Sequence, residues 1–537
     1  MGPKKNASAY VGRLGGLAVA FGIGSAILGG AGMAWAETSH DSGGSPAKSA
    51  TGSSAPAKPK PTGASARAPK KTTSQSVAVS AKAPEATKAP AAAAKPSASR
   101  VAAKVLADSP AAAALAGLAT SGRREDAPAA AFATAAAVAA PTSISSVGVG
   151  WVTGQANSAR WPQTNNTKGF GIYGTDVGIM WENGLTGNIQ LAFGDTFSGP
   201  NMTGDWRSNV LLLSQDKNLT NGLTLLPTGY AYQFIPRNQN VLFPFFGSEV
   251  TVIPTSAISV NNEQYVNYMS VKSWDTPGRW TTNYSAISMY NQATDKWVLV
   301  PSTIRSGSWF GSTTPYVPGN QNFQQAAYVL QPADQVAEGD TQYLYAFGTP
   351  SGRAGSAYLS RVDVDDVDNL AKYQYWNGKS WVTGKPVAAT PIIGDSTRSA
   401  GIFGAVLDWA NNPNVFGGML GGLFGAKTGG NVSEMSVQYN DYLGKYVMMY
   451  ADGNNNVKLR YADSPEDTWS APITVATSAT YPGLYAPMIH PWSGTGKLVD
   501  NNGNPDDSNL YWNMSLWGDY NVVLMKTDLS SLKSTLV

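Results

Sequence analysis

The stretch Tyr173-Gly-Thr-Asp-Val-Gly-Ile-Met-Trp181, followed by Ile189-Gln-Leu-Ala-Phe-Gly-Asp-Thr-Phe197, decides the fold. Both runs are rich in apolar, β-branched and aromatic residues, which favour strands. The segment between them, 182–188, is rich in turn-forming residues, so the pair predicts a β-hairpin.

The register of this hairpin brings two carboxylates together. A turn centred in 182–188 places Met180 opposite Leu191 and Asp176 opposite Asp195. Directly opposed Cβ atoms lie about 4.5–5.5 Å apart, and like charges there oppose folding. In a site that expels water, such a pair divides its protonation, and acid/base catalysis uses this division. The alternative is that one aspartate caps a turn and the other binds backbone amides.

The composition excludes several classes of chemistry. The chain of 537 residues has no cysteine, which excludes disulfides, thiolate catalysis and cysteine-bound metals. Its two histidines, His40 and His490, exclude a histidine-rich zinc site and leave only His490 for a Ser-His-Asp triad. We therefore expect no metal site and no cofactor.

The charge is distributed unevenly along the chain. Residues 1–140 contain 16 Lys and Arg against 6 Asp and Glu, whereas residues 141–537 contain 22 against 29. A basic tail thus precedes an acidic body. The sign of the body disfavours binding to nucleic acid.

The first 142 residues predict two segments without a packed core. Residues 1–36 combine a basic start, an apolar run and an Ala-Trp-Ala ending, which predicts a secretory signal peptide, the alternative being an uncleaved membrane anchor. Residues 37–142 are mostly Ala, Pro, Ser, Lys, Thr and Gly, which predicts a disordered linker. This basic linker either associates with anionic polymers of the cell envelope or only keeps the chain soluble.

From residue 143 the composition predicts an all-β domain that extends to residue 537. Short apolar runs alternate with turn signals and form five groups of three or four strands, which predicts a five-bladed β-propeller. The fourth group ends near 468–470, and the fifth has three strands near 486–489, 509–515 and 522–525. A β-sandwich with long excursions is the alternative.

One segment, 401–430, breaks this pattern. It is apolar, rich in glycine and too long for a compact turn, so it predicts an insertion between the third and fourth groups. We expect it to pack against the rim of the domain. A membrane-touching or substrate-covering role is the alternative.

Polar residues at the start of each first strand indicate where chemistry takes place, because the innermost strands of a propeller line its channel. These residues are Asp176, Glu249, Glu434, Tyr485 and His490. A glutamate in an apolar strand costs free energy unless it faces a polar cavity or partner. Several acids around one pocket are typical of a glycoside hydrolase. Alternatively, each glutamate forms a hydrogen bond to a neighbouring blade.

Aromatic and amide side chains around these acids suit sugar rings, which present C–H faces and hydroxyl edges. Glu434 and Glu249 are candidates for an acid/base role, for tuning the pKa of the catalytic pair or for binding hydroxyl groups. Many of the aromatic residues must nevertheless belong to the core. The predicted sugar contacts are Arg207, Asn209, Tyr268, Trp274, Asn283, Arg353, Tyr485, His490 and Trp517.

Several of these motifs together resemble one known family. Gly174-Thr-Asp-Val-Gly178, Phe193-Gly-Asp-Thr-Phe197 and Arg207-Ser-Asn209 are similar to the opening motifs of glycoside hydrolase family 183, the endo-D-arabinanases first catalogued as an actinobacterial domain of unknown function (DUF4185). The resemblance covers roughly residues 145–530. Weaker similarities are found at 268–270, 280–285, 433–437, 513–517 and 520–521.

This resemblance implies a five-bladed propeller that cleaves internal α-D-arabinofuranosyl bonds of arabinogalactan and lipoarabinomannan, with Asp176 and Asp195 as the paired acids. The signal peptide and linker resemble those of exported mycobacterial-type proteins, which implies a secreted or envelope-associated enzyme. Two other functions stay open: a non-catalytic, lectin-like propeller that binds envelope polysaccharide, and a purely structural envelope protein.

Overall fold

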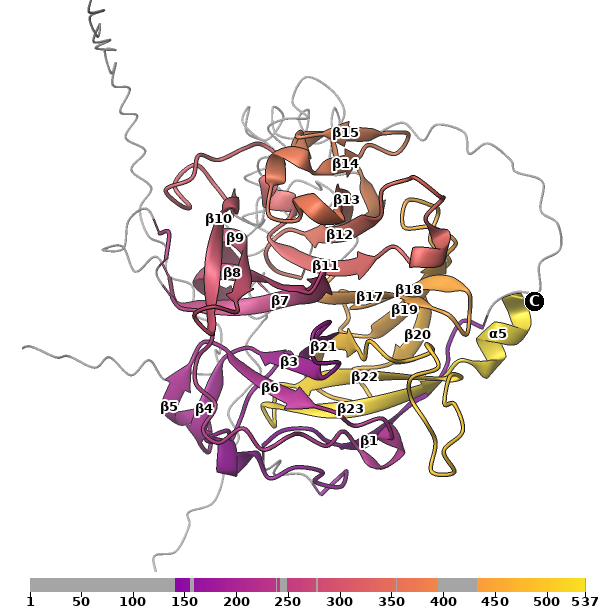
Figure 1. Ribbon diagram of the computed structural model, residues 1–537. Helices are drawn as coiled ribbons and strands as arrows, with labels where there is room; N and C mark the ends of the chain where they lie inside the picture. The colour runs from indigo at the N-terminus through magenta and orange to yellow at the C-terminus, as the bar shows by residue number, and fades with distance from the viewer. Residues whose placement is uncertain are drawn as a thin grey trace, which may run out of the picture. The chain divides into compact units, whose positions relative to one another are not determined.

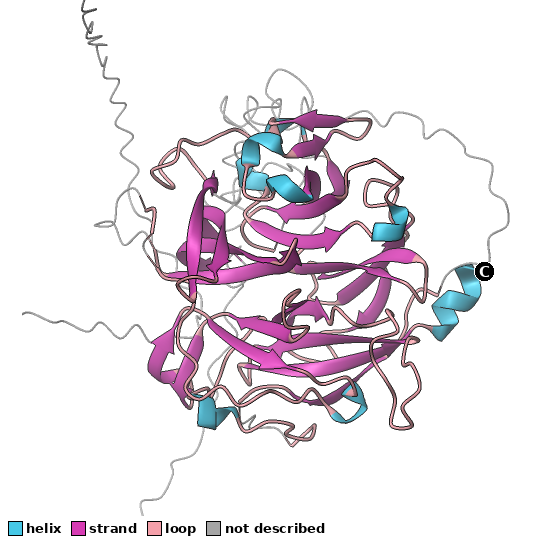
Figure 2. Cartoon of the chain, in the orientation of Figure 1, coloured by secondary structure: helices cyan, strands magenta, loops and turns pink. Residues whose placement is uncertain are grey.

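The computed structural model describes residues 141–154, 159–237, 239–241, 249–276, 279–353, 355–394 and 432–536. The predicted signal peptide, all but two residues of the predicted linker and the predicted insertion at 401–430 lie outside the described residues. The described chain is an all-β, five-bladed β-propeller (Figure 1). Figure 2 shows that its helical segments are short beside its strands.

Blades 1 and 2 are antiparallel sheets of three and four strands. Blade 1 contains β2 (Ile179–Glu182), β3 (Ile189–Phe193) and β6 (Val210–Ser214), and the hairpin β4 (Thr196–Gly199) and β5 (Thr203–Arg207) lies between β3 and β6 in sequence. Blade 2 contains β7 (Thr251–Val260), β8 (Glu263–Thr276), β9 (Arg279–Asn291) and β10 (Lys296–Ser306).

Blades 3 and 4 follow the same antiparallel pattern. Blade 3 contains β11 (Gln325–Leu330), β12 (Tyr343–Thr349), β13 (Ala357–Asp363), β14 (Gln374–Trp376), β15 (Trp381–Thr383) and β16 (Pro391–Ile393). Blade 4 contains β17 (Met435–Asn440), β18 (Lys445–Ala451), β19 (Val457–Ala462) and β20 (Ile473–Ala476). The last strand of blade 4 is therefore β20, and the prediction that this group ends near 468–470 was wrong.

Blade 5 closes the ring by combining the two ends of the domain. It contains β21 (Leu484–Ile489), β22 (Asn509–Leu516) and β23 (Asn521–Asp528), and its outermost strand is β1 (Ser146–Trp151). Ser146 pairs with Thr527 and Trp151 pairs with Val523. The prediction of three strands in this blade missed β1, because a local sequence pattern does not reveal a partner that lies more than 370 residues away.

Short helical segments lie between these strands, and one helix follows the last strand. They are η1 (Thr167–Phe170), η2 (Leu219–Asn221), η4 (Asn320–Asn322), η5 (Ala333–Gln335), η6 (Val364–Asp366), η7 (Leu370–Lys372), η8 (Pro386–Ala388) and the C-terminal helix α5 (Ser530–Leu536).

The first strands of the blades surround a common axis, since they contact one another in the circular order β2, β7, β11, β17, β21 and back to β2. Side-chain hydroxyls join neighbouring strands in this ring. The Ser256 Oγ accepts a hydrogen bond from the Tyr328 backbone N–H at 2.9 Å, and the Ser436 Oγ accepts one from the Ile489 N–H at 3.0 Å.

Five apolar cores hold the ring together, one between each pair of adjacent blades. Blades 4 and 5, for example, bury Met449 against Trp512, and blades 2 and 3 bury Tyr265 near Leu344. Because neighbouring blades cover both of its faces, a blade strand need not alternate between apolar and polar residues. All five residues of β3 and all six of β21 are buried, which explains their nearly continuous apolar sequences.

Candidate active site

The topology places the starts of all first strands at one mouth of the channel, which we name the entry face. In a four-stranded antiparallel blade, the turn between the second and third strands and the connection to the next blade lie at this same face. Asp176 and Glu249 shortly precede β2 and β7, Glu434 directly precedes β17, and Tyr485 is the second residue of β21. These four residues therefore belong to the entry face, as the sequence predicted.

The structure confirms the predicted hairpin register within the ladder, but the predicted pairing of Asp176 with Asp195 lies beyond it. Met180 pairs with Leu191, and the ladder ends where Ile179 pairs with Ala192. Beyond that pair the chain leaves the strand conformation, because Val177 and Gly178 have φ angles of 69° and 73°. A positive φ is a rare conformation for a β-branched residue such as valine, and backbone strain of this kind is concentrated at functional sites.

Contacts from two blades hold the strained segment around Asp176. The Asp176 carbonyl accepts a hydrogen bond from the Gly194 N–H at 3.1 Å, within blade 1. From blade 5, the Ser515 Oγ accepts a hydrogen bond from the Val177 N–H at 2.9 Å, and the Tyr520 carbonyl accepts one from the Thr175 N–H at 2.8 Å. The position of Asp176 is thus fixed by backbone contacts on both sides.

The two oxygens of the Asp176 carboxyl have different environments. Oδ2 accepts a hydrogen bond from the Tyr485 hydroxyl at 3.0 Å, whereas Oδ1 has no hydrogen-bond partner among the described residues. A buried carboxylate oxygen without a donor is costly, so this environment favours the protonated carboxyl.

The surroundings of Asp195 favour the charged carboxylate more than those of Asp176 do. Its Oδ1 accepts hydrogen bonds from the Trp206 indole N–H at 3.0 Å and from the Thr251 hydroxyl at 2.5 Å. The Arg237 guanidinium lies over the Trp206 ring, 4.7 Å from its centroid, and its positive charge also acts on Asp195. The β4–β5 hairpin and the start of β7 therefore supply the donors for this carboxylate.

These surroundings separate the pKa values of the two aspartates. Burial first, and then the negative charge of Asp195, raise the pKa of Asp176 to about 8, against the hydrogen bond from Tyr485. Burial also raises the pKa of Asp195, but its hydrogen bonds from Thr251 and Trp206 limit the value to about 6. Both residues keep part of their surface accessible, although the Oδ1 atom of Asp176 is itself buried. Near pH 7 the site holds one protonated and one ionised carboxyl.

An ion pair lies beside Asp176. The Arg353 guanidinium binds Glu434 through Nη2 to Oε1 at 2.8 Å and through Nε to Oε2 at 3.1 Å, and it lies 4.9 Å from the centroid of the Tyr485 ring. Burial raises the pKa of Glu434, but the charge and hydrogen bonds of Arg353 lower it further, and the net shift is downward. The Glu434 charge raises the pKa of Asp176 and the Arg353 charge lowers it.

A buried side chain in blade 3 determines the position of Arg353. The Gln325 amide at the start of β11 donates hydrogen bonds to the carbonyls of Pro350 and Gly352, both at 3.0 Å. These bonds hold the turn after β12 that ends at Arg353. Blade 3 thus contributes the positive charge of Arg353 to the site, while blades 1 and 4 contribute acidic side chains.

Glu249 and two of the predicted sugar contacts lie deeper in blade 2. Glu249 is buried, and its Oε2 accepts a hydrogen bond from the Ser270 hydroxyl at 2.6 Å. The Asn283 amide donates to the same hydroxyl at 3.1 Å, and Tyr268 is completely buried. Asn283 and Tyr268 therefore support the interior of blade 2, which corrects the prediction that they contact sugar.

Trp274 and Trp517 have the exposure that the predicted role requires. They lie in or next to the β8–β9 and β22–β23 turns on the entry face, and their exposed fractions are 48% and 46%. Trp274 packs edge-on against Trp280 at 5.6 Å, and Trp517 packs against Tyr485 at 6.3 Å.

Arg207, Asn209 and His490 are enclosed by protein, which corrects the prediction that they bind substrate. Arg207 donates to the carbonyls of Ala231 and Gly171. Asn209 uses both ends of its amide on backbone groups, among them the Ile235 N–H at 2.8 Å. His490 follows β21, at the end away from the entry face, and burial lowers its pKa to about 3.

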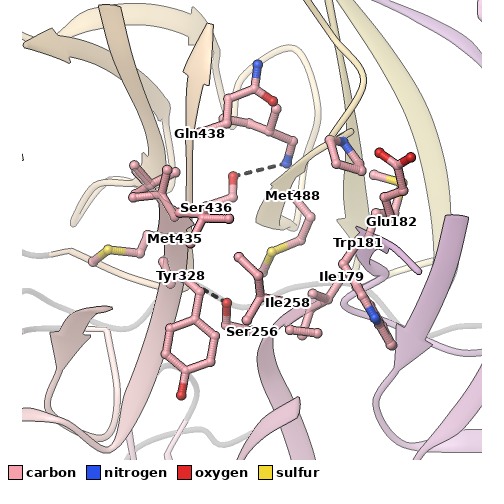
Figure 3. A pocket seen from close by; sticks show the side chains of 18 of the residues that line it. Ile179, Trp181, Glu182, Ser256, Ile258, Tyr328, Met435, Ser436, Gln438 and Met488 are labelled. Atoms are coloured by element: carbon pink, nitrogen blue, oxygen red, sulfur yellow. Dashed lines mark hydrogen bonds between the residues drawn. The ribbon is translucent and has the colours of Figure 1, made fainter. Parts of the chain in front are cut away.

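The central channel below the site holds a separate cavity of about 280 Å³. Figure 3 shows side chains of β2, β7 and β17 around it, together with Met488 of β21. Most of the labelled lining is apolar, and neither Asp176 nor Asp195 lines it. In the described part of the chain, no group of three or more His, Cys, Asp or Glu residues is placed to hold a metal ion. No helix of the described ranges has the length and hydropathy of a membrane span.

Sequence reasoning missed several residues around the two aspartates. Thr251 and Arg237 act on Asp195. Tyr520 lies near both carboxyls, since burial and then their charges raise the pKa of its phenol. Thr251 could have been found, because it opens the first strand of blade 2, the position from which the other site residues were chosen. Arg237 lies in an irregular segment with no such signal.

The fold and the site define a β-propeller with a carboxyl pair of divided protonation at its entry face. The chain belongs to the family described as "Domain of unknown function (DUF4185)", whose model matches residues 162–404 and 422–526. A curated relative, the "Uncharacterized 35.9 kDa protein in asd 3'region" of Mycolicibacterium smegmatis, is 23% identical over 320 residues, covering 58% of this chain and 77% of the relative.

Several solved structures of glycoside hydrolases are similar to this chain at low sequence identity. The α-L-arabinofuranosidase of Podospora anserina is 10% identical, with a TM-score of 0.34 over 72% of this chain and 98% of the other. The arabinanase of Bacillus subtilis is 11% identical, with a TM-score of 0.33 over 67% and 98%. A glycosyl hydrolase of Bacteroides ovatus is 10% identical, with a TM-score of 0.35 over 66% and 84%.

Proposed function

We propose that this protein is an endo-acting glycoside hydrolase that cleaves internal α-D-arabinofuranosyl linkages of cell-wall arabinan. The observation that carries the proposal is the divided protonation of Asp176 and Asp195 at the entry face. A glycosidase needs one carboxylic acid to protonate the departing glycosidic oxygen and one carboxylate to act as nucleophile or as base toward water.

The environments of the two aspartates support an assignment of their roles. Asp176, with a pKa of about 8 and an Oδ1 without a hydrogen-bond partner among the described residues, suits the general acid. Asp195, with a pKa of about 6 and two donors on Oδ1, suits the carboxylate that attacks the anomeric carbon or activates water. The substrate class rests on the motifs around both aspartates, which resemble those of endo-D-arabinanases.

The proposed location is outside the cytoplasm. The basic start, the apolar run and the small-residue ending of residues 1–36 support export, and the basic linker supports association with anionic envelope polymers.

Incubating the full chain with purified arabinogalactan tests the proposal. We expect short oligosaccharides and new reducing ends, with a bell-shaped pH profile of kcat/KM. Activity should be lost as the pH falls through about 6, where Asp195 becomes protonated, and as it rises through about 8, where Asp176 loses its proton.

Asn variants test the two roles. Asp176→Asn and Asp195→Asn should each lower kcat by about 10²- to 10⁴-fold while the protein stays folded. Asp463→Asn is the matched control, because Asp463 is exposed and pairs with Lys445 on blade 4. If both site variants keep wild-type turnover, the catalytic assignment is wrong. If the wild type binds the polymer without releasing reducing ends, the protein is a lectin-like binder.

A further inference from the structure

The exposed aromatic side chains of the described residues gather on one face of the propeller. Six tyrosines, tryptophans and phenylalanines are substantially exposed, whereas most other large aromatic residues lie in the blade cores. These residues are Tyr230, Tyr232, Trp274, Trp309, Phe310 and Trp517. Trp274, Trp309, Phe310 and Trp517 lie in inter-blade connections or in turns between second and third strands, which the topology assigns to the entry face. Tyr230 and Tyr232 lie in the β6–β7 connection and pack on each other, and the Tyr230 hydroxyl donates a hydrogen bond to Asp205 of the β4–β5 hairpin, which follows the entry-face end of β3.

Among these six residues, only Tyr232 has a larger exposed fraction than Trp309 and Phe310, whose exposed fractions are 70% and 71%. They belong to the connection that leaves β10, at the outer edge of blade 2, and reaches β11, at the inner edge of blade 3. This connection therefore crosses the entry face. Large apolar side chains exposed together on such a face indicate an interaction site.

Specific contacts hold this connection in place. The Gly307 N–H donates to the Asn283 carbonyl at 2.8 Å, and the hydroxyls of Ser306 and Ser312 are 2.7 Å apart. A Cβ at Gly311 would lie only 2.0 Å from the Asn283 carbonyl oxygen, so glycine permits the close approach of the two segments. The Trp309 ring packs against Tyr316 at 5.3 Å. The aromatic side chains are thus presented by an ordered, hydrogen-bonded segment.

This segment is also continuous with the candidate active site. Asn283, which anchors Gly307, contacts Ser270 and through it Glu249 at the start of β7. Nearer the axis, Trp274 packs on Trp280, whose ring lies 5.6 Å from the Arg353 guanidinium carbon. The exposed Trp274 is thus linked through the buried Trp280 to Arg353 beside the carboxyl pair.

We propose that Trp309 and Phe310 form a distal binding platform for the same polysaccharide chain whose bond is cleaved between Asp176 and Asp195. The platform is uncharged and aromatic, which suits the C–H faces of neutral sugar rings. It lies on the face of the carboxyl pair, which favours a polysaccharide over a protein partner. This inference rests on the proposed function, and it adds that residues remote from the cleaved bond select polymer over short substrates.

The test compares polymer with short substrate. Relative to the wild type, Trp309→Ala combined with Phe310→Ala should raise KM for arabinogalactan about ten-fold. It should change kcat/KM for a short arabino-oligosaccharide by less than about two-fold. Leu185→Ala is the matched control, since Leu185 is 50% exposed in the β2–β3 turn on the opposite face. In an Asp176→Asn background, the double substitution should weaken arabinogalactan binding by the same factor.

The outcomes separate this inference from the proposed function. If the wild type cleaves arabinogalactan and the double variant does so with an unchanged KM, the platform is refuted and the hydrolase stands. If polymer and oligosaccharide activity fall equally, the two residues act in folding or in the central site, and the platform is again refuted. If the wild type binds arabinogalactan without cleaving it and the double variant loses this binding, the binding platform is supported and the proposed hydrolase activity is refuted.

Discussion

Tyr485→Phe tests how the site controls the proton of Asp176. The substitution removes only the hydroxyl that donates to Oδ2 and leaves the ring in contact with Arg353 and Trp517. Because this hydrogen bond lowers the pKa of Asp176 against the effect of burial, its loss should raise that pKa above about 8. The basic limb of the pH profile should therefore move to higher pH.

The magnitude follows from the strength of the bond. A hydrogen bond to a charged group contributes about 1.5–3 kcal/mol, and 1.36 kcal/mol corresponds to about one pKa unit. The basic limb of kcat/KM should therefore move up by about one to two pH units, and kcat should fall because the carboxyl loses its anchor while KM changes little.

The assay is the release of reducing ends from arabinogalactan between about pH 5 and pH 10. Tyr481→Phe is the control, because this buried hydroxyl donates to the carbonyl of Ser146 in β1, the outermost strand of blade 5. The control should lose about 1 kcal/mol of stability and keep the wild-type pH profile. A basic limb of Tyr485→Phe that stays in place or moves to lower pH would refute the assignment of Asp176 as the acid.

Three further substitutions give results that differ in kind. Glu434→Gln should move the basic limb to lower pH, because it removes a charge that raises the pKa of Asp176 and leaves the opposing Arg353 unpaired. Asn209→Ala should lower the free energy of unfolding in urea by about 3 kcal/mol without moving either limb, because four backbone groups each lose a hydrogen bond. His490→Leu should make the stability of the fold less sensitive to acid. In the wild type, the unfolded chain binds a proton at this imidazole below about pH 6.5, whereas the folded chain binds it only near pH 3. The free energy of unfolding of the wild type therefore falls by up to about 1.4 kcal/mol per pH unit between these values.

Each result can also fail in a distinct way. A basic limb of Glu434→Gln at unchanged pH would show that the ion pair does not act on the acid. An unchanged free energy of unfolding for Asn209→Ala would contradict the structural role of Asn209. A shifted pH profile of kcat/KM would show that Asn209 acts in the active site. Equal stability losses of wild type and His490→Leu between pH 7 and pH 5, measured by urea unfolding, would contradict the neutral buried imidazole.

The sequence predicted the hairpin register because it depends on local information. A turn-rich segment between two apolar runs specifies which residues oppose one another, and Met180 lies opposite Leu191 as expected. It did not predict that the ladder would stop at Ile179, because the positive φ angles of Val177 and Gly178 depend on contacts from blade 5. Local patterns describe an element, whereas its distortion comes from neighbours distant in sequence.

The errors among the predicted sugar contacts have one cause. Arg207 and Asn209 belong to a motif that resembles one of the endo-D-arabinanase family, yet both form hydrogen bonds to the backbone of the irregular segments near Gly171 and residues 231–235. A long connection without regular ladders needs such partners for its N–H and C=O groups. Residue type alone does not distinguish this use from contact with a ligand, and only burial in the structure does.

The pairing of β1 with β23 has a consequence for how the molecule acquires its form during synthesis. The ribosome makes Ser146–Trp151 more than 370 residues before its partner Asn521–Asp528, so β1 has no partner strand until β23 has emerged. Until then the nascent protein is an open arc with an unsatisfied strand edge, a state prone to aggregation. Loss of β23 should thus reopen the whole circle, while a cut within a surface turn should leave it closed.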